Sequence, residues 1–377
     1  MAGIYIHIPF CKTRCIYCDF FSSASSGEKD NYINALCREI ELRKDFLSGQ
    51  EIRTVYFGGG TPSQLPVEDL KRIFDTLSCC ELDTHASAME STIEVNPDDV
   101  TEEYLRAVSP FFNRISMGVQ SFQNKDLQFL NRRHTATQAI NAITQCKKVG
   151  FENVSIDLMY GLPGQTAGEW KKNLEIAVSL QVQHISAYHL IYEEGTKLQL
   201  LLDKGKIKEV GEELSVLFYT ELIQTLSKAG FIQYEISNFA LPGYFSRHNS
   251  SYWDETHYWG LGASAHSYNG ISRQWNVSSI HQYIRQINLG IVPAEIEMID
   301  ERMAYNDYIM TGLRTIRGID LQTIESRFGL EKRVYCMQQA SKHVLNKTLS
   351  LENETLRING QGMFLSDGIM SDLMFVP

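Results

Sequence analysis

Three cysteines close to the N-terminus are the side chains best suited to chemistry. Cys11, Cys15 and Cys18 lie in HIPFCKTRCIYCDFF, at the spacing CxxxCxxC. Three thiolates on one short loop can face a common point, as an iron–sulfur cluster requires. A cluster with three protein ligands leaves one iron open to an outside ligand. The spacing therefore predicts an iron–sulfur site with one open iron.

A structural zinc site is the alternative, and it would need a fourth ligand, which His7 or Asp19 could supply. Two features of the surrounding sequence favour the cluster. The cysteine segment directly follows a predicted strand, and a glycine-rich GGGT follows the next strand. The remaining cysteines occur in segments with helical periodicity, so we expect buried small hydrophobes there: Cys37, Cys79, Cys80, Cys146 and Cys336.

The composition is that of an ordinary globular protein. Of 377 residues, 43% are hydrophobic and 21% are charged, and the 35 Lys and Arg against 45 Asp and Glu give a formal net charge of −10. This balance argues against a broad polyphosphate-binding surface, so nucleic acid is not an expected partner. The start MAGIYIHIPFCK lacks the features of a signal peptide, and we expect a cytoplasmic protein without disulfides.

Strand-like and helix-like segments alternate from residue 3 to about 190. The strand-like runs are IYIHIPF, IRTVYFGGG, STIEVNP, RISMGVQSF, NVSIDLMYGLP and HISAYHL, each followed by a helical pattern. Parallel strands need a crossover long enough to hold a helix. The pattern therefore predicts an α/β fold with a partial TIM-like (βα)6 barrel over 1–240.

Two further regions follow this predicted barrel. We expect 241–300, with an aromatic loop from Tyr244 to Trp259, to close one side of the barrel. Over 301–377 we expect helices at 302–316, 320–328 and 331–345, and then short strands in LSLEN, TLRING and GMFLSD, an order typical of a winged helix. The local balance of 8 Lys and Arg against 5 Asp and Glu in 301–348 is too small for a DNA-binding surface, which favours a packing or protein-contact domain.

Polar residues and glycines fall where the predicted strands end. Glu94, Gln120 and Asp157 close the third, fourth and fifth strands, and Gly59, Gly60 and Thr61 end the second. In a βα barrel, this C-terminal strand edge is the functional face. Surface solvation or helix capping would explain each polar residue singly, but their succession predicts a binding site.

Seven motifs occur in one order along the chain: YIHIPFCKTRCIYCDF, FGGGTPS, EVNPDD, SMGVQSFQ, LNRRH, DLMYGLPGQT and RHNSSYW. With these motifs the chain resembles the radical S-adenosylmethionine (SAM) superfamily. It is more closely similar to the oxygen-independent coproporphyrinogen III oxidase family, including its heme-chaperone branch. The resemblance covers nearly the whole chain.

The resemblance implies a [4Fe-4S] cluster on Cys11, Cys15 and Cys18, with the amino and carboxylate groups of SAM on the fourth iron. Reductive cleavage of SAM to methionine and a 5′-deoxyadenosyl radical is then expected. The residues that match family positions around the cluster and SAM are Tyr5, Tyr17, Gly59, Gly60, Thr61, Glu94, Gln120, Arg132 and Asp157. Glu94 and the glycines would serve the SAM ammonium, Gln120 and Asp157 the ribose, and Arg132, or the adjacent Arg133, the carboxylate.

Two departures separate the chain from the oxidases of this family. Phe20 stands where they carry a fourth cysteine, and the sequence begins almost on the first strand, without their longer N-terminal segment. HNSSYW also matches a pattern associated with heme in the chaperone branch, which assigns His248, Asn249, Tyr252 and Trp253 to heme. His257 or His266 could be the iron ligand instead, and a histidine packed with two aromatic residues needs no cofactor at all.

These features predict a heme chaperone that binds heme, transfers it to an acceptor and cleaves SAM. An oxygen-independent coproporphyrinogen III oxidase is the alternative, and a radical SAM enzyme for an unrelated substrate is a third. The expected partners are heme or a porphyrin, a heme-acceptor protein of unknown identity, and an electron donor of the reductase or flavodoxin type. Peripheral contact with a membrane is a further partner hypothesis.

Overall fold

The computed structural model describes residues 1–25, 27–47, 49–80, 82, 89–360 and 362–376. Its first half repeats a strand, a loop and a helix. The six strands are β1 (Ala2–Ile8), β2 (Ile52–Gly59), β3 (Glu90–Val95), β4 (Arg114–Gln120), β5 (Asn153–Tyr160) and β6 (His184–His189). The helices after them are α1 (Lys29–Leu42), α2 (Val67–Cys79), α3 (Glu102–Val108), α4 (Asn124–Phe129), α5 (Ala136–Val149), α6 (Ala167–Ser179), α7 (Lys197–Asp203) and α8 (Glu212–Lys228). Two 3-10 turns, Pro62–Gln64 and Pro97–Asp99, follow β2 and β3.

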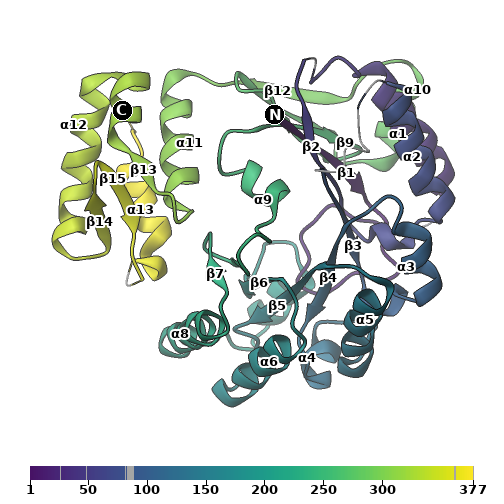
Figure 1. The fold of residues 1–377 in the computed structure, drawn as a ribbon, viewed down its shortest axis with the longest axis horizontal. Helices are drawn as coiled ribbons and strands as arrows, with labels where there is room; N and C mark the ends of the chain where they lie inside the picture. The colour runs from purple at the N-terminus through teal and green to yellow at the C-terminus, as the bar shows by residue number, and fades with distance from the viewer. Residues whose placement is uncertain (26, 48, 81, 83–88, 361, 377) are drawn as a thin grey trace.

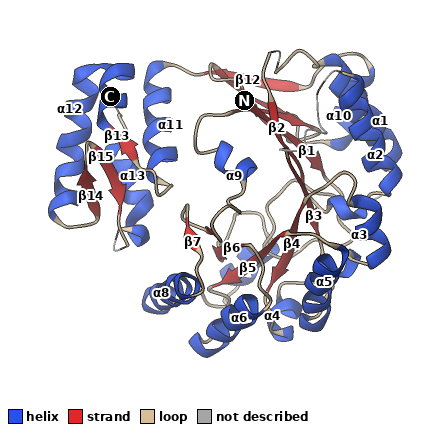
Figure 2. Cartoon of the chain, in the orientation of Figure 1, coloured by secondary structure: helices blue, strands red, loops and turns tan. Residues whose placement is uncertain are grey.

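All six strands run parallel in one sheet, in the order of the sequence. Figures 1 and 2 show the sheet curving into an open arc with the helices on its outer side. Successive side chains of a strand point to opposite faces, so one set packs under the helices and the other faces the inside of the arc. The sequence prediction of a partial (βα)6 barrel is confirmed.

Further strands extend this sheet to twelve. On one side β8 (Asn238–Ala240) pairs with β6, and β7 (Ile232–Gln233) pairs with β8. On the other side β9 (His257–Leu261) joins β1 in parallel, and β10 (His266–Tyr268), β11 (Ser272–Asn276) and β12 (Ala294–Met298) follow it. Helix α10 (Ile280–Asn288) connects β11 to β12. The predicted aromatic loop 244–259 is therefore partly regular, because it contains α9 (Arg247–Ser251) and the start of β9.

The C-terminal region is built around a second, separate cluster of buried apolar side chains. It contains α11 (Glu301–Leu313), α12 (Leu321–Leu345), α13 (Ser366–Leu373) and a small sheet in which β15 (Thr355–Ile358) lies between β13 (Ile319–Asp320) and β14 (Leu349–Glu352). The helical pattern of this region is confirmed. GMFLSD is not a strand, since 363–365 form a 3-10 turn that leads into α13. Gly329, with φ of 87°, separates the two predicted helices that α12 unites.

Two other expectations concern the remaining cysteines and the crossing of a membrane. Cys37, Cys146 and Cys336 are buried as predicted, and Cys80 is partly exposed, but the prediction for Cys79 is wrong, because this side chain is exposed at the end of α2. Among the residues described, no helix combines the length and apolar character that crossing a bilayer requires. The domain limits at 240 and 300 stay a prediction.

Candidate functional site

A cavity of about 400 Å³ lies at the C-terminal ends of the parallel strands. It collects side chains from the cysteine segment, from β2 to β6 and from the loop before α5. The residues of the sequence prediction that line it are Cys11, Cys15, Tyr17, Cys18, Gly59, Gly60, Thr61, Glu94, Gln120, Arg132 and Asp157. Parallel strands end at one edge, so motifs that are far apart in the sequence meet here.

The cysteine segment is fixed to its surroundings by backbone hydrogen bonds. The N–H of Cys11 donates to the carbonyl of Ser23 (3.0 Å), and the N–H of Ile16 donates to that of Leu130 (3.3 Å). All three cysteines are partly exposed and line the cavity. Burial raises the pKa of the Cys18 thiol to about 11, and the neighbouring Cys15 and Cys11 add to the shift.

Two of the cysteine sulfurs receive hydrogen bonds from neighbouring side chains. A [4Fe-4S] cluster binds its cysteines on separate irons. Arg132 donates from Nη1 to Cys15 Sγ (3.3 Å), and the Thr61 hydroxyl donates to Cys11 Sγ (3.5 Å). These donors favour thiolate ligands at the edge of the cavity.

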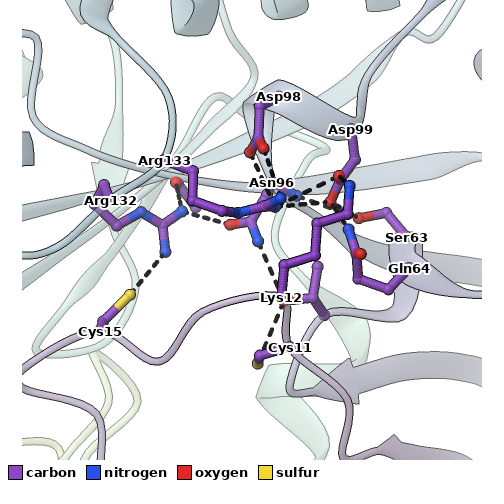
Figure 3. Close-up of polar contacts among 12 residues, drawn as sticks. Cys11, Lys12, Cys15, Ser63, Gln64, Asn96, Asp98, Asp99, Arg132 and Arg133 are labelled. Carbon is purple, nitrogen blue, oxygen red and sulfur yellow. Dashed lines mark hydrogen bonds and ion pairs between the residues drawn. The ribbon is translucent and has the colours of Figure 1, made fainter. Parts of the chain in front are cut away.

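The two adjacent arginines next to the cavity have different partners (Figure 3). Arg133 forms ion pairs with Asp98 (2.8 Å) and Asp99 (3.4 Å), and Lys12 pairs with Asp99 (2.9 Å). The Lys12 pair ties the cysteine segment to the turn after β3, and the Arg133 pairs tie the loop before α5 to the same turn. Arg132 points the other way, toward the cysteine segment, as Figure 3 shows, and its Nε has no partner among the described residues. The geometry therefore favours Arg132 over Arg133 as the group that faces a ligand.

The glycines after β2 are required by the neighbouring chain. A Cβ on Gly60 would lie 2.8 Å from the carbonyl oxygen of Ile8 and 2.9 Å from the N of Phe10. Gly59 has φ of 105°, and a Cβ there would lie 2.5 Å from the His7 ring. The family resemblance assigns these glycines to the SAM ammonium. The structure adds a second reason, which is close packing against the segment that leads into Cys11.

Glu94 and Asp157 place two carboxyl groups inside the cavity. Tyr56 donates its hydroxyl to Glu94 Oε1 (2.7 Å), and the Gly59 N–H donates to Oε2 (3.2 Å). Burial, with a smaller contribution from the nearby Asp157, raises the pKa of Glu94 to about 7 against the hydrogen bond from Tyr56, which lowers it. Burial also raises the pKa of Asp157 to about 6, against a hydrogen bond from Ser186 that lowers it. A cationic ligand group would offset this cost of burying negative charge.

Gln120 is held in a strained backbone conformation at the edge of the cavity. Its φ is 67°, in the left-handed region, and the pairing of β4 with β5 shifts register between Gly118 and Gln120. Non-glycine residues rarely adopt this region, and such strain concentrates at binding sites.

Several cavity residues were not singled out from the sequence. Asn96 accepts a hydrogen bond from Arg132 Nη2 (2.5 Å) and donates to the Thr61 hydroxyl (3.1 Å). Tyr56 on β2 and Ser186 and Tyr188 on β6 also line the cavity. The alternation of side chains along β2 could have indicated Tyr56. Residues two apart on a strand lie on the same face, and Tyr56 precedes Gly58 by two residues.

Tyr5 and the heme motif lie beside the cavity, and of these residues Asn249 reaches its wall. The Tyr5 hydroxyl bonds His7 Nδ1 (3.0 Å), and its ring stacks against Tyr56 with centroids 6.1 Å apart. Figure 1 shows α9 on the inner side of the curved sheet, where it contacts β1 and β2 and donates hydrogen bonds to Glu90 on β3. Tyr5 thus belongs to the packing between α9 and the sheet.

His248 is fully used in this packing. Its exposed fraction is 1%, its Nδ1 bonds the Thr54 hydroxyl (2.7 Å) and its Nε2 bonds the Tyr252 hydroxyl (3.0 Å). The ring stacks on Tyr56 with centroids 4.9 Å apart. Burial lowers the pKa of His248 to about 3, so the ring is neutral. In this arrangement neither ring nitrogen is available to a metal.

The other residues considered for heme lie further apart. Trp253 packs against the guanidinium of Arg314, 4.6 Å from the ring centre, at the end of α11. His257 bonds Gln50 through Nδ1 (2.5 Å), whereas His266 is exposed and stacks against Trp275. The structure therefore does not gather His248, Asn249, Tyr252 and Trp253 around one open space.

Comparison with known protein families identifies two regions of the chain. The family described as the radical SAM superfamily matches residues 5–177, and the HemN C-terminal domain matches residues 299–365. The first region holds the cysteine segment and the first five parallel strands. The second holds α11, α12 and the small sheet of β13, β14 and β15.

Curated relatives match the chain over most of its length. It is 32% identical to the heme chaperone HemW of Lactococcus lactis, over 98% of this chain and 96% of the relative. It is 35% identical to the heme chaperone HemW of Bacillus subtilis, over 87% of each chain. Among solved structures, the coproporphyrinogen III oxidase HemN of Escherichia coli, a radical SAM enzyme, shares its fold with a TM-score of 0.85 at 22% identity, covering 99% of this chain and 90% of that one.

Proposed function

The chain belongs to the radical SAM superfamily and, within it, to the family of the heme chaperone HemW, and from this we propose that it binds heme and delivers it to an acceptor. The observation that carries the proposal is a match to heme chaperones along nearly the whole of both chains, with no large part of either left over. The heme motif residues are present in this chain, and one of them, Asn249, lines the cavity.

Membership of the superfamily implies a [4Fe-4S] cluster and SAM. We place the cluster on Cys11, Cys15 and Cys18, because all three line the cavity and two receive hydrogen bonds at sulfur. When bound and reduced, the cluster supplies the electron for cleavage of SAM. The protein's own contribution is to orient SAM and to limit its contact with water.

The cavity residues divide this task by charge. The carboxyl groups of Glu94 and Asp157 suit the cationic and hydroxyl groups of SAM, and the unpartnered Nε of Arg132 suits its carboxylate. Gln120 offers an amide at the ribose end. Tyr17 and Thr61 line the same cavity next to the cysteines.

Coproporphyrinogen III oxidation is the second candidate, because the chain shares its fold with HemN. The side chain at position 20 argues against it. Phe20 is 65% exposed at the cavity mouth, where the oxidases of the family carry a cysteine. A phenyl group has no acidic or nucleophilic atom to take part in decarboxylation.

Heme or a porphyrin is the ligand class that this family membership implies. The heme acceptor, an electron donor of the reductase or flavodoxin type, a peripheral contact with a membrane and a cytoplasmic location stay hypotheses. The residues that hold the heme iron are also a proposal, with His248 first and His257 and His266 as alternatives.

One experiment on one preparation separates the two candidate functions. The full chain is reconstituted anaerobically with iron and sulfide, then titrated with ferric heme and, in parallel, assayed for conversion of coproporphyrinogen III with SAM and reductant. We expect about one heme per chain with a shifted Soret band and no decarboxylation. Formation of protoporphyrinogen IX over many turnovers, without heme binding, would instead support the oxidase function.

A further inference from the structure

Helix α9 carries the proposed iron ligand and also forms part of the SAM cavity. Asn249 lines the cavity, while His248, the residue before it, is buried against β2. Tyr56 connects the two sites, because its hydroxyl bonds Glu94 in the cavity and its ring stacks on His248. A single short helix thus contacts both sites.

Iron ligation by His248 requires α9 to move. Heme is a broad, rigid disc, and His248 Nε2 is enclosed by the Tyr252 hydroxyl on one side and the Tyr56 ring on another. The imidazole can bind iron only after its contacts with Tyr252 and the sheet are broken. Displacement of α9 would also remove Asn249 from the cavity.

The attachment of α9 to the sheet is specific and small. Glu90 Oε2 accepts the N–H of Arg247 (3.0 Å), and Oε1 accepts the N–H of His248 (3.0 Å). Thr54 adds the bond to His248 Nδ1, and the Ser246 hydroxyl caps the helix by accepting the N–H of Asn249 (3.3 Å). A helix of five residues has little stability of its own, so these contacts decide its position.

We propose that α9 alternates between a seated position, in which Asn249 completes the SAM cavity, and a displaced position, in which His248 binds heme, so that SAM and heme oppose each other's binding. The proposal rests on the proposed function, since it takes His248 as the heme ligand. Ligands that favour opposite states are coupled, and the coupling is reciprocal. A SAM-free protein would then load heme, and SAM binding would favour its release to an acceptor.

The test compares two titrations of the full, cluster-reconstituted chain under anaerobic conditions without reductant, so that SAM is not cleaved. Ferric heme is titrated with and without saturating SAM, and SAM is titrated with and without heme. We expect SAM to weaken heme binding about fivefold or more, and heme to weaken SAM binding by the same factor. Equal heme affinity with and without SAM, or tighter binding with SAM, overturns the coupling and leaves heme binding intact. Absence of heme binding overturns the proposed function itself.

A substitution at the attachment point sharpens the test. Glu90→Gln keeps the shape of the side chain, but one of the two N–H groups of α9 would then face an amide NH2 rather than an oxygen. We expect tighter heme binding and weaker SAM binding in this variant, each by about threefold or more, because the displaced state becomes more populated. Glu51→Gln is the matched control, since Glu51 is an exposed glutamate immediately before β2 and pairs with Arg53. Changes of the same sign for both ligands in Glu90→Gln would contradict the proposal.

Hydrogen exchange follows α9 directly and does not depend on a variant that folds. The amides of Arg247 and His248 are protected by Glu90 in the seated state. In wild-type protein, heme should accelerate exchange in peptides covering 246–252, and SAM should slow it. Heme binding with unchanged exchange in these peptides, or unchanged heme affinity in His248→Ala, would show that α9 need not move.

Discussion

The cysteine segment and α9 both carry motif residues, but these residues differ in how accessible they are to a ligand. Around the cysteine segment, side chains from β2 to β6 converge on one cavity, and Arg132, which lines it, has an Nε without a partner among the described residues. In α9, the nitrogens of His248 are both bonded and the ring is buried. The first region is prepared for a ligand as it stands. The second must rearrange before its histidine can bind one.

The difference teaches that a motif fixes residue types but not their accessibility. CxxxCxxC is local, and its three cysteines all line the cavity because one short loop carries them. HNSSYW is also local, yet its members separate: Asn249 faces the cavity, His248 the sheet and Trp253 the end of α11. Substitutions in the two regions should therefore change cluster content and ligand affinity by very different amounts.

The largest effect is expected at the cysteine segment. Cys15→Ser should abolish the cluster, so that iron after reconstitution falls from about four per chain to near zero. Cys79→Ser, which changes an exposed cysteine on α2, should retain full iron content. Iron and acid-labile sulfide analysis measures both variants. Stoichiometric zinc in the wild type, with no iron uptake, would contradict the prediction.

How far the sequence predicted the two regions follows from the same contrast. The parallel barrel and the convergence of Glu94, Gln120 and Asp157 were predictable, because period-2 strands and strand-end polar residues obey simple geometric rules. The choice between Arg132 and Arg133 was not, since it depends on ion pairs with Asp98 and Asp99 from a distant turn. The burial of His248 depends on Thr54 and Tyr252 together, and no local pattern reports that. GMFLSD was misjudged because short apolar runs fit a strand and a helix start equally well.

A smaller but still large effect is expected where the cavity holds SAM without holding the cluster. Asp157→Ala should weaken SAM binding by roughly ten- to a hundredfold, as expected for loss of a hydrogen bond to a charged group in a buried site. The cluster should remain, because the hydrogen bonds at the cysteine sulfurs come from Arg132 and Thr61 and not from Asp157. Isothermal titration of SAM into reconstituted protein measures the affinity, and visible absorption measures the cluster. Asp75→Ala, at an exposed position on α2, is the control. Unaltered SAM affinity in Asp157→Ala would remove β5 from the site.

Glycine 60 offers a way to break the cavity and the cluster together. Its Cβ would meet backbone atoms of Ile8 and Phe10, which a side-chain rotation cannot relieve. Gly60→Val should therefore reduce iron content as well as SAM binding. Gly168→Ala, at the start of α6 with no heavy atom within 4 Å of its Cβ, should change neither. A Gly60→Val protein with a full cluster and weak SAM binding would show that the glycine serves the ligand alone.

An effect of a few fold is expected from the titration of Glu94. Its pKa of about 7 means that the carboxyl is largely neutral at pH 6 and charged at pH 8. A carboxylate attracts the cationic groups of SAM and a neutral acid does not, so SAM affinity should rise with pH through this range. The amino group of SAM titrates as well, so the difference between wild type and Glu94→Gln isolates the contribution of Glu94. Equal slopes of affinity against pH in the two proteins would exclude it.

The smallest effect tests whether α9 hides a ligand or merely packs. Tyr252→Phe keeps the ring that packs against His248 and Tyr258, and it removes the hydroxyl that occupies His248 Nε2. If His248 binds the iron of heme, the variant should bind ferric heme a few fold more tightly, because one competing hydrogen bond of about 1 kcal/mol is gone. If the histidine only packs, the same change should leave heme affinity untouched and lower the free energy of unfolding by about 1 kcal/mol. Tyr268→Phe, which alters a ring two contacts further along the same aromatic row, controls for general loosening. Heme titration and denaturant unfolding of both variants distinguish a histidine that binds heme iron from one that only stabilises the packing of α9 against the sheet.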